Sequence, residues 1–158
     1  MSARAATSAG AKTRVSRPAA SAGYSGTPLA RKLGIAAGDE VFLVGAPANY
    51  RELVAPLPEG VRFVSRMVNG TDLVHVFATE RSKLEKAIRA ALSKLPADGV
   101  IWASWPKKSS KVPTDITEDT IREIAIPLGL VDVEVCAVDD VWSGLKLVIR
   151  RENRSTRP

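Results

Sequence analysis

Residues 73–105 read LVHVFATERSKLEKAIRAALSKLPADGVIWASW, and two short apolar runs there flank a segment with helical periodicity. The runs 73–77 and 100–105 are continuous and apolar, as in strands that are buried on both faces of a sheet. Between them Ser82 and Glu85 match a capping box, and apolar residues recur on one helical face at Leu84, Ile88, Ala91, Leu92 and Leu95. The stretch therefore predicts a strand, a crossover helix and a parallel strand.

The chain on either side continues this alternation. Thr27 and Pro28 predict the start of a short helix, and Thr117 can cap another. Further strands are predicted at 41–44, 61–64, 131–137 and 145–149, with one or two helical turns within 49–55. Together these elements predict an α/β fold, a Rossmann-like three-layer sandwich with a mainly parallel sheet of about six strands, closed by a C-terminal antiparallel hairpin.

The formal charge of +6 is concentrated at the two ends of the chain. Residues 1–22 carry +4 with no acid, residues 150–158 carry +3, and residues 23–149 hold 15 basic against 16 acidic residues. We expect 1–22 to be a disordered basic arm, 23–150 to be a single domain, and 151–158 to be a basic tail. An acid-free start rich in Ser, Arg and Ala also resembles an organellar transit peptide. Any nucleic-acid binding is expected to be weak, non-specific and mediated by the tails.

Several chemistries are excluded by residue counts. The single Cys136 cannot form an internal disulfide, and the single His75 leaves no zinc-type cluster. His75 lies within an apolar strand, so we expect a core histidine and no Ser or Cys nucleophile with a base. A chain with one cysteine suits a reducing cytoplasm. No apolar run is long enough to span a membrane, which predicts a soluble protein without membrane partners.

Specific motifs resemble the bacterial family catalogued as domain of unknown function 3052. They occur from Gly23 to Leu29, from Trp105 to Lys108, at 114–118, and from Val138 to Leu145. The resemblance extends over nearly all of 23–153 and implies no activity.

A weaker resemblance is to class I methyltransferases that use S-adenosylmethionine. The segments 33–35 and 38–41 with Gly45 are similar to the lead-in and first strand of that fold, and the closing hairpin is similar to its last two strands. The resemblance implies a glycine-rich turn and two acids, but Pro47 follows the glycine, Leu43 replaces the first acid, and residues 65–67 lack the second. We therefore predict no cofactor and no binding of S-adenosylmethionine at physiological concentration. A methyltransferase-type activity is the enzymatic alternative.

The predicted binding site lies where the parallel strands end, because open α/β sheets bind ligands at that edge. Lysines and hydroxyls after the strand at 100–105 suit a small anionic ligand, and a protein partner is the other possibility. Paired carboxylates at a tight turn favour backbone hydrogen bonds over a metal. The expected neighbourhood consists of Gly45, Trp105, Lys107, Lys108, Ser109, Asp139, Asp140 and Trp142. The sequence thus predicts a non-enzymatic or degenerate binding domain.

Overall fold

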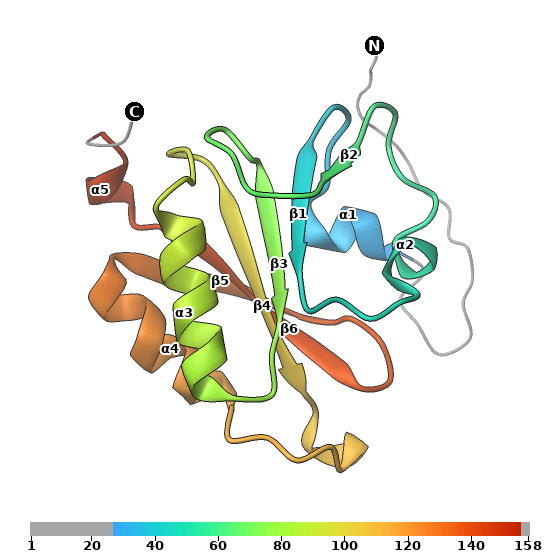
Figure 1. Ribbon diagram of the computed structural model, residues 1–158, viewed down its shortest axis with the longest axis vertical. Coiled ribbons are helices and arrows are strands. Elements are labelled where there is room, and N and C mark those ends of the chain that lie inside the picture. Colours follow the sequence, from blue (N-terminus) through green and yellow to red (C-terminus); the bar gives the residue numbers. More distant parts are fainter. Residues whose placement is uncertain (1–26, 156–158) are drawn as a thin grey trace.

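The computed structural model describes residues 27–155, in which helices cover both faces of a six-stranded sheet (Figure 1). The strands are β1 (Glu40–Val44), β2 (Arg62–Val64), β3 (Leu73–Phe77), β4 (Val100–Pro106), β5 (Leu130–Ala137) and β6 (Trp142–Ile149). The α-helices are α1 (Leu29–Leu33), α2 (Tyr50–Leu53), α3 (Arg81–Leu92), α4 (Glu118–Ala125) and α5 (Arg151–Arg154). Two 3₁₀ turns follow β4 and α4, at Lys108–Ser110 (η1) and Ile126–Leu128 (η2).

The strand order is β2-β1-β3-β4-β6-β5. Neighbours from β2 to β4 are parallel, whereas β6 is antiparallel to both β4 and β5. It follows that β5 runs in the same direction as β4. The predicted Rossmann-like architecture with a C-terminal hairpin is confirmed.

The connection from β2 to β3 contains no helix. Val64 pairs with Phe42 of β1, after which residues 65–72 return to the other end of the sheet, where the Asp72 amide donates to the Glu40 carbonyl at 3.1 Å. Within this connection, Met67 packs against the apolar core that lies between the sheet and the helices α3 and α4. β2 therefore ends before the edge of the sheet at which β1 ends.

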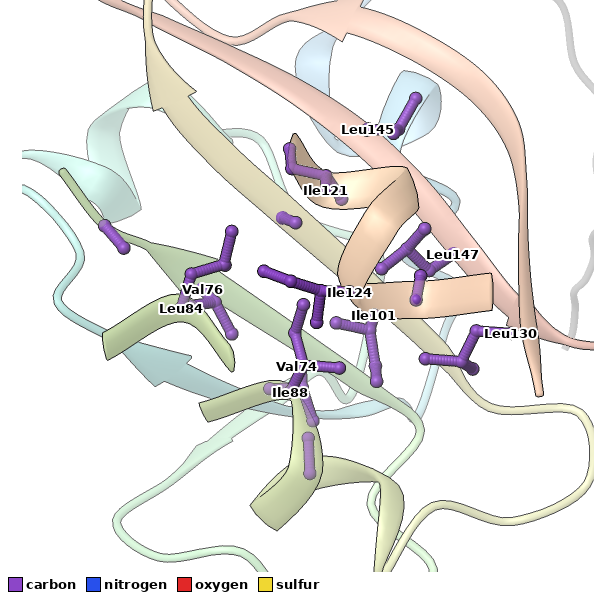
Figure 2. Close-up of a cluster of buried hydrophobic side chains, with 14 of the residues drawn as sticks. Val74, Val76, Leu84, Ile88, Ile101, Ile121, Ile124, Leu130, Leu145 and Leu147 are labelled. Atoms are coloured by element: carbon purple, nitrogen blue, oxygen red, sulfur yellow. The ribbon is translucent and has the colours of Figure 1, made fainter. Parts of the chain in front are cut away.

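Each face of the sheet has its own apolar core. On the first face, α3 and α4 place Leu84, Ile88, Ile121 and Ile124 against the sheet residues Val74, Val76, Ile101 and Leu147 (Figure 2). On the second, α1 and α2 pack on Val41, Leu73, Phe77 and Trp102. The Trp102 indole N–H donates to the Leu33 carbonyl at 2.8 Å, which fixes α1 to the sheet. Burial on both faces explains the continuous apolar runs of the central strands.

Two predicted helix starts are wrong in detail. Pro28, not Thr27, occupies the capping position of α1. Ser82 lies inside the first turn of α3, and Glu80 at the capping position makes no side-chain cap, so the predicted capping box does not form. Thr117 does cap α4, where its hydroxyl accepts from the Thr120 amide at 3.2 Å.

The predicted arm at 1–22 lies outside the described residues. At the other end, residues 151–154 form α5, and the Arg154 guanidinium donates to the Ile149 carbonyl at 2.8 Å. No helix within 27–155 has the length and apolar character needed to cross a membrane.

Candidate functional site

The strands β1, β3, β4 and β5 run in the same direction and end at one edge of the sheet, which is the lower edge in Figure 1. The chain passes from β1 outward to β2 and then returns to β3 on the opposite side of β1. The order of strands thus reverses between β1 and β3, and open α/β sheets usually bind their ligands in a crevice at such a switch point. Gly45, Thr79, Lys107 and Asp139 lie within two residues of these strand ends.

Gly45 lies at this switch point, directly after β1. Its φ of 67° is left-handed, and a Cβ built on it lies 2.6 Å from the carbonyl oxygen of Phe77. A side chain at this position therefore collides with β3. The glycine allows two strand ends to approach each other, and the space that its missing side chain leaves is taken by protein backbone.

Backbone hydrogen bonds bring together the predicted site residues that follow β4 and β5. Pro106 pairs with Trp142 in the sheet, and the Lys107 amide donates to the Val141 carbonyl at 2.7 Å. Asp139 shapes the turn, because its Oδ1 atom accepts from the amides of Val141 and Trp142, each at 2.8 Å. The carboxylate of Asp139 is thus used structurally, as paired acids at a turn often are.

The predicted tryptophans lie on the same edge but on opposite faces of the sheet. Trp105 is half-buried against the core under α3 and α4, whereas Trp142 meets Phe77 on the other face, edge to face at 5.1 Å between centroids. Lys108, Ser109 and Asp140 are exposed. Within 27–155, no ion pair joins the lysines of this cluster to Asp139 or Asp140.

The loop after β4 also reaches the end of β3. The Thr114 hydroxyl donates to the Thr79 carbonyl at 2.7 Å, and Asp115 Oδ1 accepts from the Arg81 amide at 2.7 Å. Asp115 therefore caps the amino end of α3, where Ser82 was the expected cap. Unlike a serine hydroxyl, its carboxylate is also anionic. Sequence spacing gives no signal for this contact, since the two residues are far apart in the chain.

A buried polar chain lies on the second face. Tyr50 Oη is 2.9 Å from Nδ1 of His75, and Nε2 of His75 is 2.7 Å from the Ser104 hydroxyl. Burial lowers the pKa of His75 to about 3 and raises that of Tyr50. The expected core histidine is confirmed, with both ring nitrogens bonded. Its partners were not predicted, although the apolar spacing of Tyr50, Leu53 and Val54 marks the buried side of α2.

The described residues contain no group of three or more His, Cys, Asp or Glu side chains that could hold a metal ion. Cys136 is buried, and burial raises the pKa of its thiol. A raised thiol pKa leaves little reactive thiolate at neutral pH.

No family model matches the chain, and no curated protein matches it in sequence. Among solved structures, the chain is similar to an S-adenosylmethionine-dependent methyltransferase from Clostridium acetobutylicum at a TM-score of 0.53 and 10% identity, over 77% of this chain and 87% of that one. It is also similar to DhpI in complex with SAH (TM-score 0.51, 12% identity, 78% and 82% covered). Fibrillarin from Aeropyrum pernix with natively bound S-adenosyl-L-methionine gives a TM-score of 0.51 at 14% identity, with 72% and 68% covered.

These similarities show that the chain has the fold of class I methyltransferases. At such identities they establish the fold alone, and the resemblance to domain of unknown function 3052 stays a prediction.

The residues at the crevice do not fit S-adenosylmethionine. Leu43, at the position where the fold family carries an acid, packs with the apolar core of the second face. Gly45 meets Phe77 instead of opening a cradle, and Pro47 lacks an N–H donor. Ser65 follows a β2 strand that ends short of the edge. The chain therefore has the fold of these proteins without such polar contacts at Leu43, Gly45 and Ser65.

Proposed function

We propose that this chain is a small-molecule-binding protein built on the methyltransferase fold. Its ligand carries phosphate or carboxylate groups and binds at the carboxyl edge, beside the crevice between β1 and β3. The observation that carries the proposal is a set of lysines held in a fixed loop where the fold places its ligands, while the contacts for S-adenosylmethionine are absent from Leu43, Gly45 and Ser65.

The lysine loop is ordered by its own hydrogen bonds. The Ser110 hydroxyl donates to the Lys107 carbonyl at 2.7 Å and accepts from the Val112 amide at 3.2 Å. Within residues 27–155, the ammonium groups of Lys107, Lys108 and Lys111 form no ion pair. Three cations at a fixed edge without carboxylate partners attract an anion, and their attraction is strongest where the ligand is partly desolvated.

Calorimetry on the full-length protein tests this proposal with inorganic phosphate, ATP and S-adenosylmethionine at one ionic strength. We expect a saturable isotherm for phosphate or ATP and none for S-adenosylmethionine. The double variant Lys107→Ala/Lys108→Ala should remove that isotherm. The matched control Lys86→Ala/Lys94→Ala removes the same charge from exposed positions in and just after α3 and should leave it intact. Equal weakening by both pairs, or no isotherm for either anion, contradicts the proposal.

The second candidate is a transferase of methyltransferase type. It is favoured by the fold, because similar structures are named for methyl transfer or hold S-adenosylmethionine or SAH. A micromolar isotherm for S-adenosylmethionine, displaced by S-adenosylhomocysteine, would replace the first proposal with this one. Such binding requires polar contacts from residues other than Leu43 and Ser65.

A further inference from the structure

The hydrogen-bonded chain Tyr50–His75–Ser104 joins α2 to the centre of the sheet. Tyr50 is 2% exposed, and His75 and Ser104 are fully buried. The three residues come from α2, β3 and β4, so the chain crosses from the segment after β1 to the strand that carries the lysine loop. It lies on the same face as α1 and α2, away from α3 and α4 (Figure 1).

Because Tyr50, His75 and Ser104 are buried, the loss of either hydrogen bond between them lowers stability. A neutral imidazole has one donor and one acceptor, and a buried polar atom that loses its partner is costly. The ring of His75 is stacked on Phe77 at 4.3 Å and meets the edge of Tyr50 at 5.3 Å between centroids. Tyr50 also meets Phe77 and Phe63 edge to face, at 5.8 and 6.1 Å between centroids, so three ring contacts and one directional bond position it.

The segment that Tyr50 anchors is short and is held by side-chain contacts. α2 has only four residues, and Asn49 at its capping position makes no side-chain cap. A helix this short is not stable in isolation. Its attachment depends on Tyr50, on the apolar contacts of Leu53 and Val54, and on the Arg51 guanidinium, which lies over the Phe63 ring at 4.2 Å. Residues 45–54 directly follow β1, and Tyr50 packs on Phe77 at the end of β3, so this segment covers the carboxyl ends of both strands on this face.

We propose that Tyr50 is a latch. When its bond to His75 breaks, α2 and the preceding loop move away from the sheet as a unit and uncover the carboxyl ends of β1 and β3. The latch is a property of the fold and needs no ligand. Its role in admitting a ligand rests on the proposed function.

Opening also changes what His75 can do. In the closed state its ring faces Tyr50, Phe77 and Trp102 with Ser104, and the only other titratable group among them is the Tyr50 hydroxyl. In the open state Nδ1 meets water and can take up a proton near the ordinary pKa of about 6.5. Acid therefore favours the open state by up to about tenfold for each pH unit below that value.

Hydrogen exchange on the full-length protein tests the latch through the amides of residues 50–54, with α3 as an internal reference. Tyr50→Phe removes only the hydroxyl, and we expect the protection factors of residues 50–54 to fall about fivefold while those of 81–92 stay within about twofold. Thr71→Val is the matched control. It removes another buried hydroxyl, which donates to the Val68 carbonyl at 2.8 Å, and should leave residues 50–54 unchanged.

In the wild-type protein, the protection factors of residues 50–54 should fall about tenfold between pH 7.5 and 5.5, after correction for intrinsic exchange. Equal loss of protection in residues 50–54 and 81–92 would show a global stabilising bond and overturn the latch. Unchanged protection in Tyr50→Phe, or pH-independent protection in the wild type, overturns it as well. A failed calorimetric titration removes the proposed function and leaves these results standing.

Discussion

Gly45 shows how one residue allows two strand ends to approach each other. It adopts a left-handed φ of 67° directly after β1 and lies against the Phe77 carbonyl. Only glycine satisfies both conditions, because an L side chain is strained at this φ and its Cβ has no room. The requirement is therefore set by strand packing, whatever the ligand is.

We expect Gly45→Ala to lower the free energy of unfolding by more than about 2 kcal/mol, since left-handed strain of about 1 kcal/mol is added to a backbone clash. Gly38→Ala is the control. Its φ is 81°, and a Cβ there meets no atom within 4 Å, so only the strain of about 1 kcal/mol applies. Urea denaturation measures both variants. An equal loss in the two would mean that β1 and β3 separate without cost.

Asp39 gives a residue-scale prediction about pH. Burial raises the pKa of this carboxyl to about 6, with Asp72 and Asp98 adding to the shift, although the Ala36 amide donates to it at 2.8 Å. A raised folded-state pKa means that the carboxyl favours folding fully below its ordinary value of 3.8, and that this contribution is lost as the pH rises through about 6.

Asp39→Asn should therefore be more stable than the wild type at pH 8, because the amide keeps an acceptor for Ala36 without a charge. The difference in melting temperature should stay constant above about pH 6, shrink as the pH falls from 6 towards 3.8, and vanish below 3.8. Thermal unfolding across this range measures it, with Asp98→Asn as a control for removing one of the neighbouring charges. A constant difference at every pH would show that the charge of Asp39 is not involved.

At the scale of elements, the amino end of α3 is capped by a residue from another loop. Asp115 accepts from the Arg81 amide at 2.7 Å, and its loop is fixed to the end of β3 by Thr114. A carboxylate at this position satisfies an orphan amide and complements the helix dipole. Two adjacent side chains, Thr114 and Asp115, thus join this loop to the end of β3 and to α3.

Asp115→Ala should lower the free energy of unfolding by about 1 kcal/mol, which is the usual effect of losing a helix cap. Ser82→Ala, at the position that sequence spacing predicts as the cap, should change it by no more than about 0.5 kcal/mol. Asp115→Asn should recover most of the loss, because its amide oxygen still accepts. Denaturant titration of the three variants decides the matter, and a larger effect of Ser82→Ala would restore the predicted cap.

The elements were predictable where local periodicity controls them. The strand at Leu73–Phe77 and the helix that follows come directly from apolar spacing, and the closing hairpin comes from period-two alternation. The Asp115 cap and the Tyr50–His75 bond were not predictable. Each joins residues that are distant in sequence, and such contacts leave no mark in a local pattern.

At the scale of the whole molecule, strand direction determines at which edge the candidate site lies. Side-chain contacts determine which of its predicted residues are available to a ligand. The carboxyl edge could be predicted because crossover connections bring parallel strand ends together. Hydrogen bonding then assigned Asp139 to a turn, and packing directed Trp142 towards Phe77. Lys107 and Lys108 stay as predicted ligand contacts.

The charge of the whole chain supports one last prediction. The part from 23 to 149 is nearly neutral, whereas Arg4, Lys12, Arg14 and Arg17 give the first 22 residues a charge of +4. Cations bind the phosphate backbone mainly by releasing counterions, so such binding is independent of base sequence and weakens steeply with salt. We therefore expect any affinity of the full-length protein for duplex DNA to come from its ends.

Changing these four residues to Gln should weaken binding to DNA of random sequence and reduce the slope of log affinity against log salt by up to about 3.6, or about 0.9 for each phosphate that the arm no longer neutralises. Lys107→Gln/Lys108→Gln should change the slope far less, because these lysines serve a different ligand in our proposal. Fluorescence anisotropy over a salt series measures both variants. If the arm variant keeps the wild-type slope while the lysine pair reduces it, the carboxyl edge itself binds nucleic acid, and the anion that the lysine loop attracts is a phosphate backbone.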